Sequence, residues 1–142
     1  MKVLVLNGPN LGTLGTRQPD LYGTTTLSEL EDALGARGRE LGVDVECLQS
    51  DEAPVLIEAL RTTDAEAVIL NPASLTHHSR ALAEAVAGCA ASVYEVHITN
   101  INAREPYRRH SLVAPHARGS IIGLGVRGYM LALEAAAQEV IG

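Results

Sequence analysis

A tyrosine in a glycine-rich stretch is the first residue of this sequence that could do chemistry. Tyr22 could be a hydrogen-bonding residue of a lid or a general base. A free phenol has a pKa of about 10, so ionising it at pH 7 costs about 4 kcal/mol. A nearby guanidinium reduces this cost because a positive charge favours the phenolate. Arg17 precedes Tyr22 in the same stretch, and we expect it to be that partner, with a purely structural tyrosine as the alternative.

A histidine with a neighbouring acid is the second candidate. Glu95 and His97 lie in a strand-like run, where alternation places their side chains on the same face. A carboxylate beside an imidazole fixes the tautomer of the ring and favours its charged form, which suits a general acid. A histidine at a strand end can also be structural, but the polar residues Thr99 and Asn100 that follow favour a functional position.

Other polar residues are open to more than one interpretation. Arg104 and Arg108 have the spacing of one helical face and could form a substrate clamp or a solvated basic patch. His77 and His78 are adjacent and point in different directions, which does not suit a shared metal ion. The run 123–128 reads GxGxxG but follows the last strand-like run, so we reject dinucleotide binding. We predict neither a metal nor a cofactor.

Short apolar runs alternate with helical stretches along the whole chain. The runs are Val3–Leu6, Val43–Leu48, Ala67–Leu70, Ser92–Val96 and Ser120–Ile122, and the helical stretches are Leu27–Leu41, Pro54–Leu60, Ser79–Val86 and Tyr129–Ile141. Thr26 or Ser28 could cap the first helix. Such alternation indicates a parallel sheet covered on both faces. We predict a single α/β domain over residues 1–142, a flavodoxin-like doubly wound sheet of five parallel strands in the order 2-1-3-4-5.

Polar residues collect where these runs end. Asn10 follows the first run closely, Asn71 ends the third, and His97 ends the fourth. Ligands of open parallel sheets bind beyond the carboxyl ends of the strands, where the winding reverses. The sequence therefore predicts one crevice that all three residues share. The connections 8–25 and 98–118 are too long for simple links, and we expect them to be lids or binding loops.

Composition narrows the possible partners. The net charge of −6 and a pI near 5.3 argue against nucleic acid, which requires a basic surface. The sequence shows no long apolar span and no signal peptide, so we expect a cytoplasmic protein that does not bind membranes. Cys47 and Cys89 match no metal-ligand spacing and are expected to be reduced thiols.

Several ordered blocks of the sequence resemble type II 3-dehydroquinate dehydratase, and the similarity runs nearly end to end. The blocks are Leu6-Asn7-Gly8-Pro9-Asn10-Leu11, Leu14-Gly15-Thr16-Arg17, Tyr22-Gly23, Gln49-Ser50, Asn71, Thr76-His77, Glu95-Val96-His97-Ile98-Thr99-Asn100, Arg104-Glu105, Arg108 and Gly123-Leu124-Gly125 with Gly128-Tyr129. The resemblance implies a lyase that converts 3-dehydroquinate to 3-dehydroshikimate in aromatic biosynthesis or in quinate breakdown.

The resemblance also implies a role for each matching residue. Tyr22, as phenolate, would remove the proton beside the ketone, with Arg17 stabilising the charge. Asn10 would hold the enolate oxygen. His97, oriented by Glu95, would protonate the departing hydroxyl. This chemistry needs no metal, cofactor or covalent adduct. The type I enzyme uses a lysine Schiff base, and the only lysine here is Lys2.

Substrate binding and assembly follow from the same resemblance. The substrate carboxylate would bind the backbone N–H groups of Ile98 and Thr99 and the side chain of Asn71. His77 and Arg108 would hold ring hydroxyls. The family assembles trimers into a homododecamer, in which an acidic side chain, here Glu84, reaches a neighbouring subunit's site.

A few positions depart from the family pattern. Ala73 and Ser74 stand where glycine is usual, His78 replaces a threonine, Glu84 an aspartate and Gln18 a glutamate. These changes concern the side that binds the substrate ring. Three alternatives therefore remain open. The protein could be a paralogue that dehydrates a modified dehydroquinate, such as its amino analogue. It could also be a flavodoxin-like module that binds FMN or another small ligand, or a non-catalytic relative.

Overall fold

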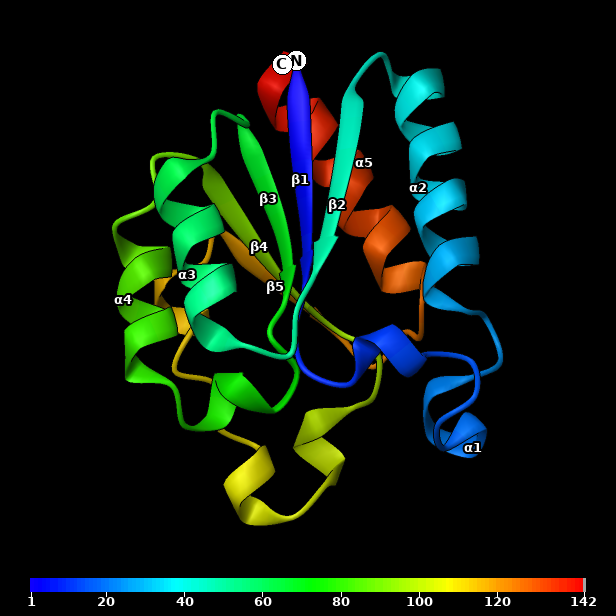
Figure 1. The fold of residues 1–142 in the computed structure, drawn as a ribbon, viewed down its shortest axis with the longest axis vertical. Coiled ribbons are helices and arrows are strands. Elements are labelled where there is room, and N and C mark those ends of the chain that lie inside the picture. The colour runs from blue at the N-terminus through cyan, green and yellow to red at the C-terminus, as the bar shows by residue number, and fades with distance from the viewer. Residues whose placement is uncertain (142) are drawn as a thin grey trace.

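A computed structural model describes residues 1–141 and shows a five-stranded, all-parallel sheet in the order β2-β1-β3-β4-β5 (Figure 1). The strands are β1 Lys2–Asn7, β2 Asp44–Gln49, β3 Ala67–Asn71, β4 Ser92–His97 and β5 Gly119–Ile122. The register places Asn7 beside both Gln49 and Asn71, so three polar side chains end neighbouring strands at one edge of the sheet. The predicted strand order is confirmed.

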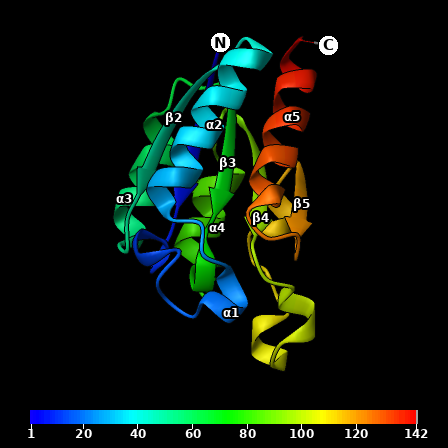
Figure 2. The same cartoon turned by 90° about the vertical axis from the view of Figure 1, so that its right-hand side faces the viewer.

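Helices cover both faces of the sheet. They are α2 Leu27–Leu41, α3 Ala53–Thr62, α4 Arg80–Ala87 and α5 Arg127–Ile141, whereas the short α1, Pro19–Tyr22, lies in the connection 8–25. Figures 1 and 2 show α2 and α5 on one face and α3 and α4 on the other. Alternation along β1 divides its side chains accordingly: Val3 and Val5 belong to the core under α2 and α5, and Leu4 and Leu6 to the core under α3 and α4.

Local signals account for where α2 begins and ends. The Thr26 hydroxyl accepts from the Glu29 N–H at 3.1 Å, and the Glu29 carboxylate accepts from the Thr26 N–H at 2.9 Å. This reciprocal capping box identifies Thr26, not Ser28, as the cap. At the other end, Gly42 has a φ of 78°, a conformation that glycine adopts at little cost. The helix therefore spans the predicted residues.

The two long connections contain short helices. Residues 8–25 hold the 3-10 helix Leu11–Thr13 and α1, and residues 98–118 hold three 3-10 helices, Ile101–Ala103, Pro106–Arg108 and Ala114–His116. Pro106 and Pro19 each stand in the first turn, where a missing N–H is tolerated. Residues 8–25 and the first part of 98–118 lie beyond the carboxyl ends of the strands (Figure 2). The rest of 98–118 returns to the start of β5, where the Arg118 N–H donates to the Val93 carbonyl.

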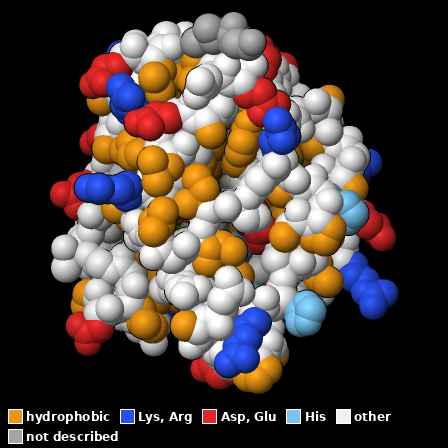
Figure 3. All heavy atoms as spheres, turned by 180° about the vertical axis from the view of Figure 1, so that it is seen from behind, with side chains coloured by type: hydrophobic (Ala, Val, Ile, Leu, Met, Phe, Trp, Pro, Cys, Tyr) orange, Lys and Arg blue, Asp and Glu red, His pale blue; other side chains and the backbone are white. Residues whose placement is uncertain are grey.

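The surface carries mixed charge on the face seen from behind Figure 1. There, basic side chains stand singly among acidic and apolar ones (Figure 3). This arrangement agrees with the net charge of −6. None of the helices among the described residues combines the length and the apolar character that crossing a bilayer requires.

Candidate active site

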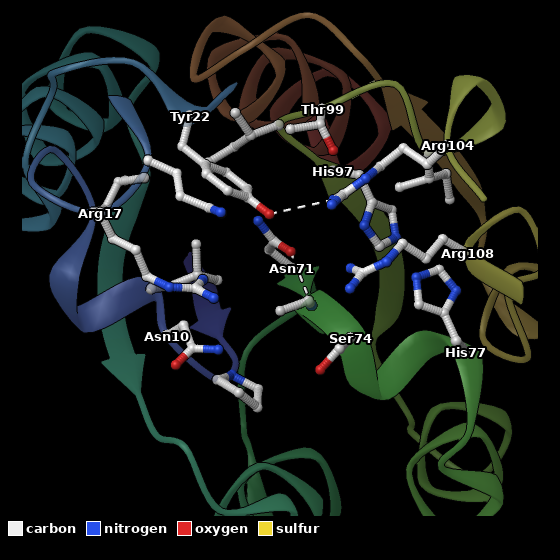
Figure 4. A pocket seen from close by; sticks show the side chains of 17 residues that line it. Asn10, Arg17, Tyr22, Asn71, Ser74, His77, His97, Thr99, Arg104 and Arg108 are labelled. Atoms are coloured by element: carbon white, nitrogen blue, oxygen red, sulfur yellow. Dashed lines mark hydrogen bonds between the residues drawn. The ribbon is translucent and has the colours of Figure 1, made fainter. Parts of the chain in front are cut away.

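The predicted crevice is a pocket of about 260 Å³ beyond the carboxyl ends of the strands (Figure 4). Its walls come from the two long connections, from the ends of β3 and β4, and from the 3-10 helix Ala73–His77. The lining residues are Pro9, Asn10, Leu11, Leu14, Arg17, Gln18, Tyr22, Asn71, Ala73, Ser74, His77, His97, Ile98, Thr99, Ile101, Arg104 and Arg108. The structure thus brings nine of the eleven residues that were singled out into the wall of one pocket.

Glu95 and His97 form the buried pair that strand alternation predicts. His97 Nε2 lies 2.6 Å from Glu95 Oε2, and the two residues are 4% and 1% exposed. His97 lines the pocket, whereas Glu95 lies behind it. A buried carboxylate at this distance accepts the Nε2 proton and fixes the orientation of the ring. The pair can therefore hold a proton at the pocket wall.

Hydroxyl groups surround the Glu95 carboxylate. Thr76 donates to Oε2 at 2.7 Å, Ser111 to both oxygens at 2.8 and 2.9 Å, and Ser120 to Oε1 at 3.4 Å. Burial alone would raise the pKa of Glu95, but the bonds from His97, Thr76 and Ser111 outweigh it and lower the pKa. The carboxylate therefore stays charged beside His97.

The partner of Tyr22 differs from the one expected. Arg104 Nη1 donates to the Tyr22 hydroxyl at 3.3 Å, while Arg17 forms no hydrogen bond with Tyr22 in the described residues. Arg17 still lines the pocket, and Figure 4 shows Arg17 and Arg104 on different sides of the tyrosine ring. Arg17 is near in sequence, but the 98–118 connection folds over the pocket and brings Arg104 to the phenol. Arg17 and Arg104 thus both line the pocket that holds the phenol, together with Arg108.

Asn10 is held in an uncommon backbone conformation. Its φ is 70°, which costs energy in residues other than glycine, and its N–H donates to the Asp51 carboxylate at 2.9 Å. Gln49 Nε2 donates to the same carboxylate at 3.1 Å and to the Gly8 carbonyl at 3.2 Å. A side chain on Gly8 would collide with the Pro72 carbonyl oxygen at 2.8 Å. Gly8 follows β1 and Pro72 follows β3, so the close approach of these two strand ends requires a glycine at position 8.

The remaining candidates offer hydrogen-bonding groups at the opposite wall. His77 Nδ1 lies 2.7 Å from the His110 carbonyl oxygen, to which it donates, so Nε2 is left as an acceptor in the neutral ring. Burial is the main cause that lowers the pKa of His77 and favours this neutral form. Arg108 lines the pocket and pairs with Glu105 at 3.1 Å. Ile98 and Thr99 follow His97 along the wall.

The comparisons with known proteins can be set beside this geometry. The sequence model described as Dehydroquinase class II matches residues 1–137. The chain belongs to the class II dehydroquinase family. It is 49% identical to a 3-dehydroquinate dehydratase of Desulforudis audaxviator, over 99% of this chain and 95% of that protein. It is 45% identical to catabolic 3-dehydroquinase 2 of Aspergillus flavus, with the same two coverages.

A solved structure gives the same assignment. The type II dehydroquinase of Propionibacterium acnes superposes with a TM-score of 0.89 at 47% sequence identity, covering 96% of each chain. The fold and the order of its strands are therefore those of this family. The names of these relatives support the dehydroquinate interpretation over an amino analogue or a flavin-binding module.

The structure separates the departures from the family pattern into two groups. Gln18, Ala73 and Ser74 line the pocket of this dehydroquinase, so they can contact a substrate. His78 and Glu84 are exposed and are not among the residues of the pocket wall. Ala73 has a φ of 51°, which explains why a glycine suits this position.

No cluster of three or more potential metal ligands occurs among the described residues.

Sequence reasoning missed four contributors to the site. The sequence indicated Arg104 as half of a basic pair and in the block Arg104-Glu105, but not as the partner of Tyr22. Nor did it indicate that the hydroxyls of Thr76, Ser111 and Ser120 donate to Glu95. Serine and threonine are common and carry no periodic signal. The one available clue was the charge of Glu95, because a buried carboxylate needs several donors.

Proposed function

We propose that this protein dehydrates 3-dehydroquinate to 3-dehydroshikimate. The observation that carries the proposal is the arrangement of a candidate base and a candidate acid in one pocket: Tyr22 with a guanidinium on its oxygen, and His97 with a buried carboxylate behind it. Tyr22 as phenolate takes the proton from the carbon beside the ketone, and the electron pair becomes an enolate. The enolate then expels the ring hydroxyl, which takes a proton from His97 and leaves as water.

Charge development sets the roles of the neighbouring groups. The guanidinium groups of Arg104 and Arg17 stabilise the phenolate, Arg104 through its hydrogen bond and Arg17 from its place in the pocket wall. Asn10 holds the enolate oxygen. Glu95 keeps a negative charge next to the ring that supplies the proton. These roles need only proton transfers between side chains and substrate.

Substrate binding uses the wall opposite the tyrosine. Asn71 and the N–H groups of Ile98 and Thr99 bind the carboxylate, and these two N–H groups form no hydrogen bond within the described residues. His77, through its free Nε2, and Arg108 bind ring hydroxyls. Residues 8–25, which carry the base, form a lid over the bound ring.

Oligomeric assembly accounts for Glu84. This residue is exposed on α4 and lies outside the pocket of its own chain, so any contact with substrate would have to be in the pocket of a neighbouring chain. We propose that trimers assemble into a dodecamer and that Glu84 reaches a neighbour's site. The expected cytoplasmic location stays a prediction.

The test is a spectroscopic assay with purified protein and 3-dehydroquinate. The product has a carbon–carbon double bond conjugated to the ketone, so its ultraviolet absorbance rises as water is lost. We expect turnover without any added metal or cofactor. The matched control is Tyr22→Phe, which keeps the ring but removes the proposed base. Absence of turnover by the unaltered protein would overturn the proposal.

A further inference from the structure

Behind the pocket lies a buried chain of hydrogen bonds. Tyr129, in the first turn of α5, donates to Asn7 Oδ1 at 2.6 Å and accepts from Asn71 Nδ2 at 2.8 Å. Asn71 Oδ1 accepts from the Ala73 N–H at 3.0 Å. Asn7 and Tyr129 are fully buried and Asn71 is 3% exposed. This series of hydrogen bonds therefore connects the end of β1 and the start of α5 to two residues of the pocket wall.

The direction of each bond follows from the backbone of Ala73. A backbone N–H can only donate, so the oxygen of the Asn71 amide must face it. The Asn71 NH₂ group then faces Tyr129, whose hydroxyl accepts this bond and donates its own proton to Asn7. Burial raises the pKa of Tyr129, so the hydroxyl keeps the proton that it donates. The amide of Asn71 therefore has one favourable orientation.

This orientation decides what Asn71 offers to a ligand. An amide NH₂ group has two N–H donors, and Tyr129 uses one of them. The second has no acceptor within residues 1–141, and Asn71 lines the pocket. A flipped amide would turn its oxygen, which carries partial negative charge, toward an anionic ligand. The buried chain thus favours binding of an anion at this wall.

We propose that Tyr129 is a positioning residue that, together with the Ala73 N–H, fixes the Asn71 amide with an N–H directed at the substrate carboxylate. The proposal rests on the function proposed above and concerns substrate affinity, because Asn71 does not contact the atoms that exchange protons. Asn7 ends the chain as an acceptor: its Nδ2 is buried and has no partner in the described residues. An aspartate at position 7 would also accept from Tyr129, so it would preserve the direction of these hydrogen bonds.

The first test compares two conservative variants, both assayed with 3-dehydroquinate. Tyr129→Phe removes only the hydroxyl, and we expect KM to rise about tenfold while kcat stays within about threefold. Tyr94→Phe is the matched control, because Tyr94 is also buried but donates to Glu139, away from the pocket. It should leave KM unchanged. An unchanged KM in Tyr129→Phe would overturn the proposal.

A double-mutant cycle separates positioning from general damage to the core. In an Asn71→Ala background the amide is absent, so Tyr129→Phe should produce no further rise in KM. Equal effects of Tyr129→Phe in both backgrounds would show a merely structural role and refute the proposal. If Tyr129→Phe does not fold, the Asn7 variants decide: Asn7→Ala should raise KM, and Asn7→Asp should restore it. Equal KM values in these two variants would also refute the proposal.

Failure of this inference is distinguishable from failure of the proposed function. If the unaltered protein does not dehydrate 3-dehydroquinate, the function itself is wrong. If it does, and KM is insensitive to Tyr129 and Asn7, only the positioning role is wrong.

Discussion

Replacing Glu95 by glutamine tests whether the carboxylate is needed for its charge. Glutamine has nearly the same shape, and its amide can place the NH₂ group toward the Ser111 and Ser120 hydroxyls, which can rotate to accept. Its oxygen then still accepts from His97, so the ring stays oriented. The variant thus removes the negative charge and retains the hydrogen bond.

The geometry gives the size of the expected effect. Opposite charges about 4 Å apart near a protein surface attract by about 4 kcal/mol, and the His97–Glu95 pair is closer and almost fully buried. The neutral hydrogen bond that remains in Glu95→Gln retains about 1 kcal/mol of this attraction. The net loss of about 3 kcal/mol corresponds to about 100-fold in kcat at neutral pH. This lies within the range of about 10²- to 10⁴-fold that general acids contribute.

The pH dependence of activity supplies the sharper readout. The pKa of Glu95 is lowered from its ordinary value of 4.5, so the carboxylate loses its charge only in solution more acidic than that. Protonation of Glu95 in acid should therefore lower kcat of the unaltered protein, and this acid limb should be missing in Glu95→Gln. Initial rates of absorbance change between about pH 3 and pH 7 measure this difference (roughly the range over which a carboxylate titrates).

Stability should respond on the acid side. The pKa of Glu95 is lowered from its ordinary value of 4.5, so its contribution to stability is present above that pH and is lost as the pH falls through the lowered value. In Glu95→Gln this part of the acid destabilisation should be missing from denaturation curves. Glu139→Gln, on α5 beside the start of β4 and away from the pocket, is the control with unchanged activity. A Glu95→Gln enzyme with a normal rate and a normal pH profile would refute the charge argument.

Three further predictions concern the base, the pocket wall and the assembly. Tyr22→Phe should lower kcat by about 10³-fold with KM changed by less than about threefold, and near-normal turnover would place the base elsewhere. Ala73→Gly should raise the free energy of unfolding, measured in denaturant, by about 0.5 kcal/mol. Glycine relieves about 1–2 kcal/mol of strain at the left-handed backbone of this position, which exceeds the cost of about 0.4–1 kcal/mol from the greater freedom of the unfolded chain. A lower free energy of unfolding would contradict this expectation. Mixed oligomers of Glu84→Ala and Tyr22→Phe chains should, after subunit exchange, exceed the activity of either parent, whereas the average of the parents would exclude a role in a neighbour's site.

The elements of this fold could be predicted because each is specified locally. The apolar run at Val3–Leu6 and the capping signal at Thr26 depend on residues a few positions apart. The strand order follows from general rules for parallel sheets. The convergence of Asn71 and His97 then follows as well, because parallel strands end at the same edge.

Contacts between the two long connections could not be predicted from local sequence signals. Tyr22 and Arg104 are 82 positions apart, and no pattern in either segment indicates that their side chains meet. Nearness in sequence pointed to Arg17 instead. The hydroxyls of Thr76, Ser111 and Ser120 likewise come from three separate segments and meet only at the Glu95 carboxylate.

The two sides of the pocket are built differently, and this difference bears on how the enzyme tolerates change. His97 and Asn71 end strands, and each is held from behind by buried partners, Glu95 and Tyr129. Tyr22 comes from a connection outside the sheet, and its side chain makes a single hydrogen bond, of 3.3 Å, in the described residues. Rigid elements position groups more precisely than loops do. Substitutions behind the strand ends should therefore alter the proposed acid and the proposed carboxylate site without changing the pocket wall itself. The position of the proposed base should depend instead on how the two connections close over the substrate.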